Sequence, residues 1–140
     1  MTDINNFTRQ HKDILSDINE IDKIVSKQDY EEHLNEFVSH INSLAGKLKI
    51  HLSYEDKFLY PNLINGQDTE LKNMAEEYIQ EMGDIADVFA VYKDEFNTKS
   101  KINDKLDTFK ADTKRILDEI KNRISKEENG LYKVIVEKEL

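Results

Sequence analysis

The stretch YEEHLNEFVSHINSLAGKLKIHLSYEDKFLYP, residues 30–61, decides the fold. Apolar or buriable side chains recur in it at alternating steps of four and three residues, the period of a helix with one buried face. The pattern runs unbroken to Tyr60-Pro61 and predicts one long amphipathic helix. Its buried stripe contains Tyr30, Leu34, Phe37, Ile41, Leu44, Leu48, His51, Glu55 and the pair Phe58/Leu59.

Three more segments show the same helical period, at residues 7–25, 71–96 and 102–131. Asn65-Gly66-Gln67-Asp68 separates the second segment from the third, and Asp68 or Thr69 can cap the helix that follows. Short loops leave neighbouring helices antiparallel, because they cannot carry the chain back across a bundle. We therefore predict an all-α fold, an antiparallel up-down-up-down four-helix bundle that forms a single domain over residues 1–140.

Composition narrows the classes of function. The 140-residue chain has no Cys, so any metal must bind His and carboxylate side chains. A formal charge of -9 disfavours nucleic acid as a partner. The first residues lack the features of a signal peptide and no apolar run reaches bilayer length, so we expect a cytoplasmic protein without a membrane partner. No enzymatic activity is predicted, because the sequence has neither a nucleophile elbow nor a phosphate loop.

An internal repeat relates the two halves of the chain. Residues 51–60, HLSYEDKFLY, align without gaps on residues 123–132, RISKEENGLY. The same shift also aligns apolar residues elsewhere in the two halves, but shared helical patterning alone could produce those matches. The identical residues in this alignment are therefore the main support for a repeat. They are Ser53 with Ser125, Glu55 with Glu127, Leu59 with Leu131 and Tyr60 with Tyr132. The bundle is therefore interpreted as two similar helical hairpins.

Metal-binding side chains lie on the buried stripes. His51 and Glu55 are four residues apart on one helix face, where an imidazole and a carboxylate can reach the same ion. His11 is expected at the same height on the first helix, and the repeat brings Glu81 and Glu127 to that level. Two imidazoles and three carboxylates suit iron, manganese or zinc. The simpler alternative is that His51 and Glu55 lie near a wet end of the bundle and satisfy each other.

The combination of His11 with the motif His51-Leu-Ser-Tyr-Glu55-Asp-Lys-Phe-Leu59-Tyr60-Pro61 resembles the hemerythrin-like, or HHE cation-binding, family. The resemblance covers nearly the whole chain. It implies a four-helix bundle that holds two irons through histidines of all four helices and bridging carboxylates. It also implies roles in oxygen binding, nitric-oxide or redox sensing, or iron handling. Residue by residue, His11, His51, Glu55 and Glu127 match the ligand positions of the family.

Two family histidines are replaced in this chain. Met82 stands at the position in the third helix and Arg123 at the position in the fourth. A thioether is a poor ligand for hard iron, and a guanidinium cannot ligate a metal at all. Haem bound through Met82 is disfavoured, since the sequence has no Cys-x-x-Cys-His attachment motif.

Two interpretations follow with equal weight. In the first, iron or another divalent metal binds in a mononuclear or altered dinuclear site, with Glu81 as a substitute ligand and dioxygen or nitric oxide as a small-molecule ligand. This protein would serve sensing, storage or stress response. In the second, Arg123 replaces the ion and neutralises Glu55 and Glu127, and a metal-free bundle acts through protein–protein contacts. Arg123 can also extend to solvent, because Ile124 competes for the inward position.

Overall fold

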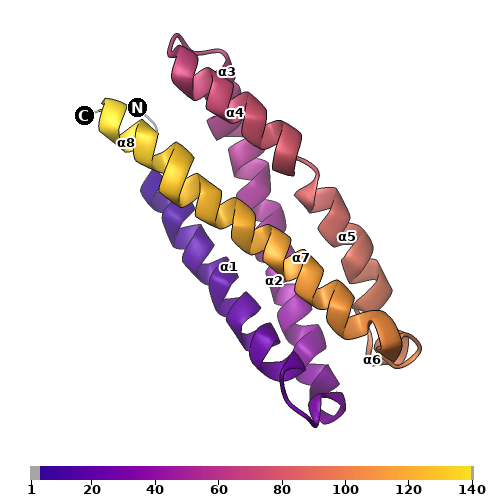
Figure 1. Ribbon diagram of the computed structural model, residues 1–140. Coiled ribbons are helices and arrows are strands. Elements are labelled where there is room, and N and C mark those ends of the chain that lie inside the picture. Colours follow the sequence, from indigo (N-terminus) through magenta and orange to yellow (C-terminus); the bar gives the residue numbers. More distant parts are fainter. Residues whose placement is uncertain (1–3, 140) are drawn as a thin grey trace.

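The computed structural model describes residues 4–139, which are helical almost throughout (Figure 1). The α-helices are α1 (Ile4–Val25), α2 (Leu34–Tyr54), α3 (Tyr60–Ile64), α4 (Thr69–Met82), α5 (Ile85–Phe96), α6 (Lys99–Asn103), α7 (Leu106–Lys126) and α8 (Tyr132–Glu139). A 3-10 turn at Tyr30–His33 and two π-helical turns, at Glu55–Leu59 and Glu127–Leu131, complete the helical elements of this range. Across residues 4–139 there is no strand, and no helix is both long and apolar enough to span a bilayer.

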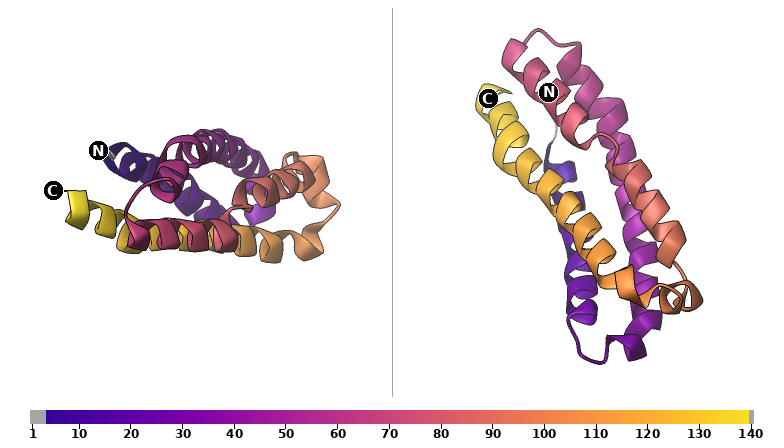
Figure 2. Two further views of the ribbon diagram at one scale, coloured as in Figure 1. Left: turned by 90° about the horizontal axis from the view of Figure 1, so that it is seen from above. Right: turned by 45° about the vertical axis from the view of Figure 1, so that its right-hand side comes forward.

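The helices form four long rods that run alternately up and down the bundle. α1 is the first rod, α2 with α3 the second, α4 with α5 the third, and α7 with α8 the fourth. The start of α1 and the end of α8 lie at the same end of the molecule (Figure 2), as an even number of passes requires. The prediction of an all-α, up-down-up-down four-helix bundle is confirmed.

The apolar interior is divided into two clusters with a polar layer between them. On the first rod, Phe7 belongs to the smaller cluster and Ile14 to the larger one. On the fourth rod, Leu131 belongs to the smaller cluster and Ile124 to the larger one. His11 therefore lies between the clusters, at the level where the predicted ligands of the other rods also occur.

The third rod departs from the sequence prediction. Residues 71–96 were expected to form one continuous helix, but α4 ends at Met82 and α5 begins at Ile85. A Cβ atom at Gly83 would collide with the carbonyl of Ile79, so only glycine fits where the rod bends. The predicted start of this rod is confirmed, because Oδ1 of Asp68 accepts a hydrogen bond of 3.0 Å from the backbone N–H of Leu71.

Candidate metal centre

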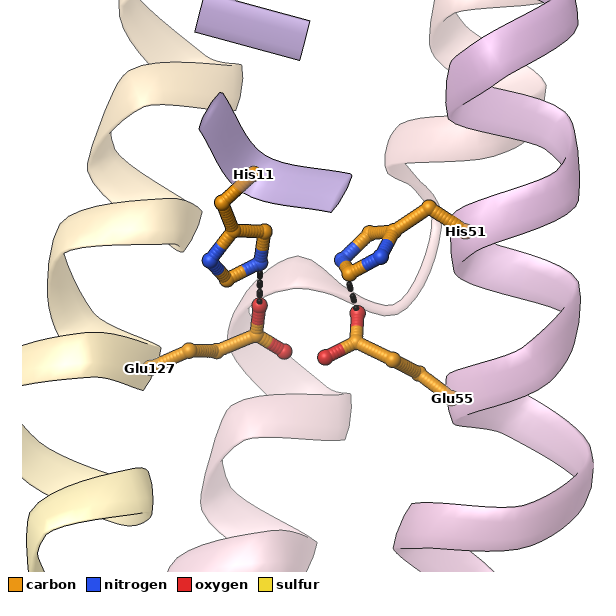
Figure 3. A group of neighbouring side chains, drawn as sticks. All are labelled: His11, His51, Glu55 and Glu127. Atoms are coloured by element: carbon orange, nitrogen blue, oxygen red, sulfur yellow. Dashed lines mark ion pairs between the residues drawn. The ribbon is translucent and has the colours of Figure 1, made fainter. Parts of the chain in front are cut away.

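Four side chains of metal-binding type meet in the polar layer (Figure 3). His11 comes from α1, His51 from α2, and Glu55 and Glu127 from the two π-helical turns. One ligand atom of each residue lies within 4.8 Å of the ligand atoms of the other three. None of the four is more than 2% exposed. The structure therefore brings together four of the five residues that the sequence suggested as metal ligands.

The two carboxylates occupy equivalent places in the two hairpins. Glu55 is the first residue of one π-helical turn and Glu127 is the first residue of the other. A π turn contains an extra residue relative to an α turn, and such turns occur frequently at functional sites. The extra residue lets the glutamate and the Leu-Tyr pair that follows it face the interior, as Leu59 and Tyr60 do after Glu55. The structural repeat thus explains why the identities in the sequence repeat fall at these positions.

The orientation of His51 leaves a nitrogen lone pair facing a carboxylate. Nδ1 of His51 lies 2.7 Å from Oε1 of Gln10. An amide oxygen only accepts hydrogen bonds, so Nδ1 carries the proton and Nε2 keeps its lone pair. Nε2 lies 3.1 Å from Oε1 of Glu55, yet it has no hydrogen-bond partner within residues 4–139. Burial, and then the neighbouring His11, lower the pKa of His51 from 6.5 to about 3, so the ring is neutral at physiological pH.

His11 faces the second carboxylate, and its nitrogen without a hydrogen-bond partner among the described residues is Nδ1. Its Nε2 atom lies 3.2 Å from Oε1 of Glu127, which also lacks a hydrogen-bond partner among the described residues. The two imidazole rings are 4.5 Å apart between centroids, in an edge-to-face arrangement. Burial, and then the charge of Glu55, raise the pKa of Glu127. The centre thus presents two imidazole nitrogens to two carboxylate oxygens in a buried layer of the bundle.

Two tyrosines fix the remaining carboxylate oxygens. The hydroxyl of Tyr60 donates a hydrogen bond of 2.5 Å to Oε2 of Glu127, and the hydroxyl of Tyr132 donates one of the same length to Oε2 of Glu55. Burial and the nearby glutamates raise the pKa of both phenols, so both remain protonated donors. Each carboxylate therefore has one oxygen held by a tyrosine and the other turned toward a histidine.

Arg123 closes the third side of the centre. Its Nη2 atom lies 3.4 Å from Oε1 of Glu55, its Nε atom lies 3.4 Å from Oε2 of Glu127, and its Nη1 atom donates a hydrogen bond of 3.0 Å to the carbonyl of Met82. Burial alone would lower the pKa of Arg123, but the charges of Glu127 and Glu55 outweigh it and raise that pKa. The guanidinium therefore stays charged inside the bundle, 5% exposed, and the suggestion that it extends to solvent is wrong.

The model of the hemerythrin HHE cation binding domain matches residues 2–135. The chain belongs to this family. No curated protein and no solved structure matches it. Met82 and Arg123 lie next to each other in this HHE domain, because the Met82 carbonyl accepts a hydrogen bond from Arg123.

Glu81 does not join the centre of this HHE domain. Its side chain is 52% exposed and its Oε2 atom pairs with Nζ of Lys126 at 2.5 Å. The expectation that Glu81 supplies a substitute ligand is wrong, and the reason is the direction of its side chain around the helix. Successive residues of a helix point about 100° apart, so Met82 faces inward and its neighbour Glu81 faces solvent.

Several residues around the centre were not predicted. Gln10, which orients His51, gives no signal in the sequence, because it borders the buried stripe of α1. Tyr132 had a signal, since the repeat pairs it with Tyr60, whose hydroxyl is the kind of donor a buried carboxylate needs. Tyr54, which lies within the His51–Pro61 motif, is 50% exposed.

Proposed function

We propose that this HHE domain binds one divalent metal ion, iron in the first place, through His11, His51, Glu55 and Glu127. The observation that carries the proposal is the unsatisfied lone pair of His51 Nε2, which faces Oε1 of Glu55 at 3.1 Å inside the bundle. Two acceptors this close repel each other unless a cation or a proton lies between them. A cation bound to both would remove that repulsion and give His51 Nε2 a partner.

The donor set suits the proposed ion. Two neutral imidazoles and two carboxylates are ligands for Fe²⁺, Mn²⁺ or Zn²⁺ in helical bundles. Glu55 and Glu127 together carry two negative charges when ionised, and Arg123 supplies one positive charge. One negative charge therefore remains without compensation in the buried layer, which favours uptake of a cation.

We further propose that Arg123 takes the place of a second metal ion. Its guanidinium contacts one oxygen of each carboxylate, which is the role of a bridging cation, and it cannot itself ligate a metal. The hydrogen bond of Arg123 to the Met82 carbonyl holds the guanidinium on that side of the centre. The proposed site is accordingly mononuclear, unlike the two-iron site that the family resemblance implies.

The residues around the ion have separable tasks. The tyrosines orient the carboxylates, Gln10 fixes the tautomer of His51, and the two apolar clusters exclude water. A cleft of about 270 Å³ on the surface is lined in part by Asp56, Tyr60 and Arg123, so it lies beside residues that contact the two carboxylates. Bound iron would supply a change of oxidation state and a position for dioxygen or nitric oxide. We infer a binding protein for sensing, storage or stress response rather than an enzyme.

The rival function is a metal-free bundle that acts through protein–protein contacts. The ion pairs of Arg123 with Glu55 and Glu127 favour it, because a buried guanidinium can neutralise carboxylates on its own. Protonation of Glu127, whose pKa is raised, would remove the remaining charge.

Metal analysis of the purified protein separates the two functions. The protein is purified without chelator or an affinity metal, and its iron content, visible spectrum and melting temperature with added Fe²⁺ are measured. Our proposal requires about one iron per chain and a melting temperature that rises with Fe²⁺ concentration. The variant His51→Ala should lose the metal, whereas His33→Ala, at a histidine outside the centre, should keep it. No bound metal and an unchanged melting temperature would establish the metal-free function instead.

A further inference from the structure

A side chain from another helix contacts the backbone of the second π-helical turn. The hydroxyl of Tyr78, on α4, donates a hydrogen bond of 3.0 Å to the carbonyl of Lys126, the residue before the turn. The backbone of Leu131, the last residue of the turn, lies close to the same phenol oxygen. In a π turn the carbonyl of residue i faces the N–H of residue i+5, and these two groups belong to Lys126 and Leu131. The hydroxyl therefore lies at the widened hydrogen bond of the turn.

Gly130 makes room for this hydroxyl. A Cβ atom at Gly130 would collide with the Tyr78 oxygen and lie 3.9 Å from Cε of Met74. Glycine inside a helix lowers helix stability relative to alanine, so its presence here requires a compensating reason. The close approach of the Tyr78 hydroxyl supplies that reason. In the first hairpin the equivalent position holds Phe58, which is 55% exposed.

The width of this turn decides where two residues of the metal centre point. Removing one residue from a helical turn rotates everything beyond it by about 100°. The turn begins at Glu127, whose Oε1 faces His11 at 3.2 Å, and it ends just before Tyr132, whose hydroxyl binds Glu55. If the turn closed to an ordinary α turn, these two side chains could no longer both face the interior.

We propose that Tyr78 is a positioning residue for the metal centre: its hydroxyl, admitted by Gly130, holds open the turn that aims Glu127 at His11 and Tyr132 at Glu55. Neither Tyr78 nor Gly130 contacts an imidazole or a carboxylate of the centre in the contacts described above. Their action passes through the backbone between Lys126 and Leu131. The consequence for metal affinity rests on the proposed function, whereas the effect on the turn itself does not.

The variant Tyr78→Phe removes only the hydroxyl, and Tyr92→Phe is its matched control. Tyr92 belongs to the same rod and is buried, whereas Tyr78 is partly buried. The Tyr92 hydroxyl lies 2.6 Å from Oγ1 of Thr113, in a hydrogen bond away from the centre. Amide hydrogen exchange is measured by NMR on chelator-treated protein. We expect the amides of Leu131 and Tyr132 to exchange about tenfold faster in Tyr78→Phe than in Tyr92→Phe, because the turn loses a local hydrogen bond.

Fe²⁺ affinity gives the second readout. We expect Tyr78→Phe to weaken Fe²⁺ binding on the order of tenfold or more, as loss of an outer-layer partner does at other metal sites, and Tyr92→Phe to leave it unchanged. Gly130→Ala should also weaken Fe²⁺ binding, because its Cβ collides with the Tyr78 oxygen. In a Tyr78→Phe background that oxygen is absent, so the same Gly130→Ala change should weaken binding less.

The two readouts keep the two proposals distinct. If the parent protein binds no Fe²⁺, the proposed function fails, and the exchange measurement still decides the role of Tyr78. Selective acceleration at Leu131 and Tyr132 supports the positioning role. Exchange at these amides that matches the Tyr92→Phe control would overturn it.

Discussion

The hydroxyl of Tyr132 lies 2.5 Å from Oε2 of Glu55, and the two residues belong to different hairpins. The reciprocal hydrogen bond, from Tyr60 to Oε2 of Glu127, crosses in the opposite direction. Each hairpin thus supplies one carboxylate and the donor for the carboxylate of the other. These two hydrogen bonds can form only when both hairpins pack together, so orientation of the carboxylates depends on closure of the bundle.

The variant Tyr132→Phe tests the strength of this cross-connection. It leaves a buried carboxylate without its donor, so we expect the free energy of unfolding in urea to fall by about 1.5–3 kcal/mol. Tyr54→Phe is the control, because Tyr54 is half exposed and its change should cost almost nothing. Equal unfolding free energies for the two variants would contradict a structural role for the Tyr132 hydroxyl.

His51 predicts a pH dependence of the metal-free protein. Its pKa is about 3 in the folded state because of burial, and near 6.5 in the unfolded chain. Between these values the unfolded chain binds a proton that the folded protein does not. The contribution of His51 is therefore fully present above pH 6.5 and is lost as the pH falls toward 3, by up to about 1.4 kcal/mol per pH unit.

Urea unfolding of chelator-treated protein at a series of pH values measures this slope. The variant His51→Gln should be less sensitive to acid than the parent over the same range, and His33→Gln should follow the parent, because His33 lies outside the centre. Parallel pH profiles for His51→Gln and the parent would show that His51 is not buried in its neutral form.

The helical fold and most of the centre followed from sequence periodicity. A stripe at steps of three and four residues places His11, His51 and Glu55 inward whatever the details of packing, because burial of the apolar neighbours fixes the rotation of each helix. The repeat then assigned Glu127 the place equivalent to Glu55. These predictions depended only on the rotation of single helices and on antiparallel packing.

The remaining features depend on local breaks in helical periodicity, which the stripe cannot reveal. The π turns at Glu55 and Glu127 add one residue each, and helical patterning with a mixed three-four period absorbs such an insertion without a visible signal. The bend at Gly83 also lies within a continuous stripe. Glu81 was misplaced because the hairpin repeat fixed its height along the bundle and not its direction around the helix.

Replacing Arg123 tests its role as a buried cation. In metal-free protein, Arg123→Met leaves Glu55 and Glu127 without a positive partner, and we expect a loss of about 3–5 kcal/mol in unfolding free energy. The surface variant Arg115→Met is the control, since Arg115 is 72% exposed in an ion pair with Asp112. Arg123→Met should also bind Fe²⁺ more tightly than the parent, because the guanidinium then no longer competes with the metal ion for the two carboxylates. Unchanged stability together with unchanged affinity would contradict both expectations.

Histidines placed at Met82 and Arg123, where the family resemblance implies them, test whether Arg123 occupies the place of a second ion. Met82 is buried at the end of α4 and its carbonyl contacts Arg123, so the double variant Met82→His/Arg123→His adds two imidazoles next to each other beside the carboxylates. These nitrogens would face the carboxylate oxygens that the guanidinium contacts in the parent. We expect the iron content to rise from about one to about two ions per chain, because two histidine pairs can then share the bridging carboxylates.

Arg123→His alone should give a smaller increase, since one imidazole is a poor anchor for a second ion. Metal analysis of folded, chelator-free protein measures both values, with circular dichroism to verify helix content. A double variant that folds and keeps the iron content of the parent would refute the idea that the guanidinium substitutes for a metal ion.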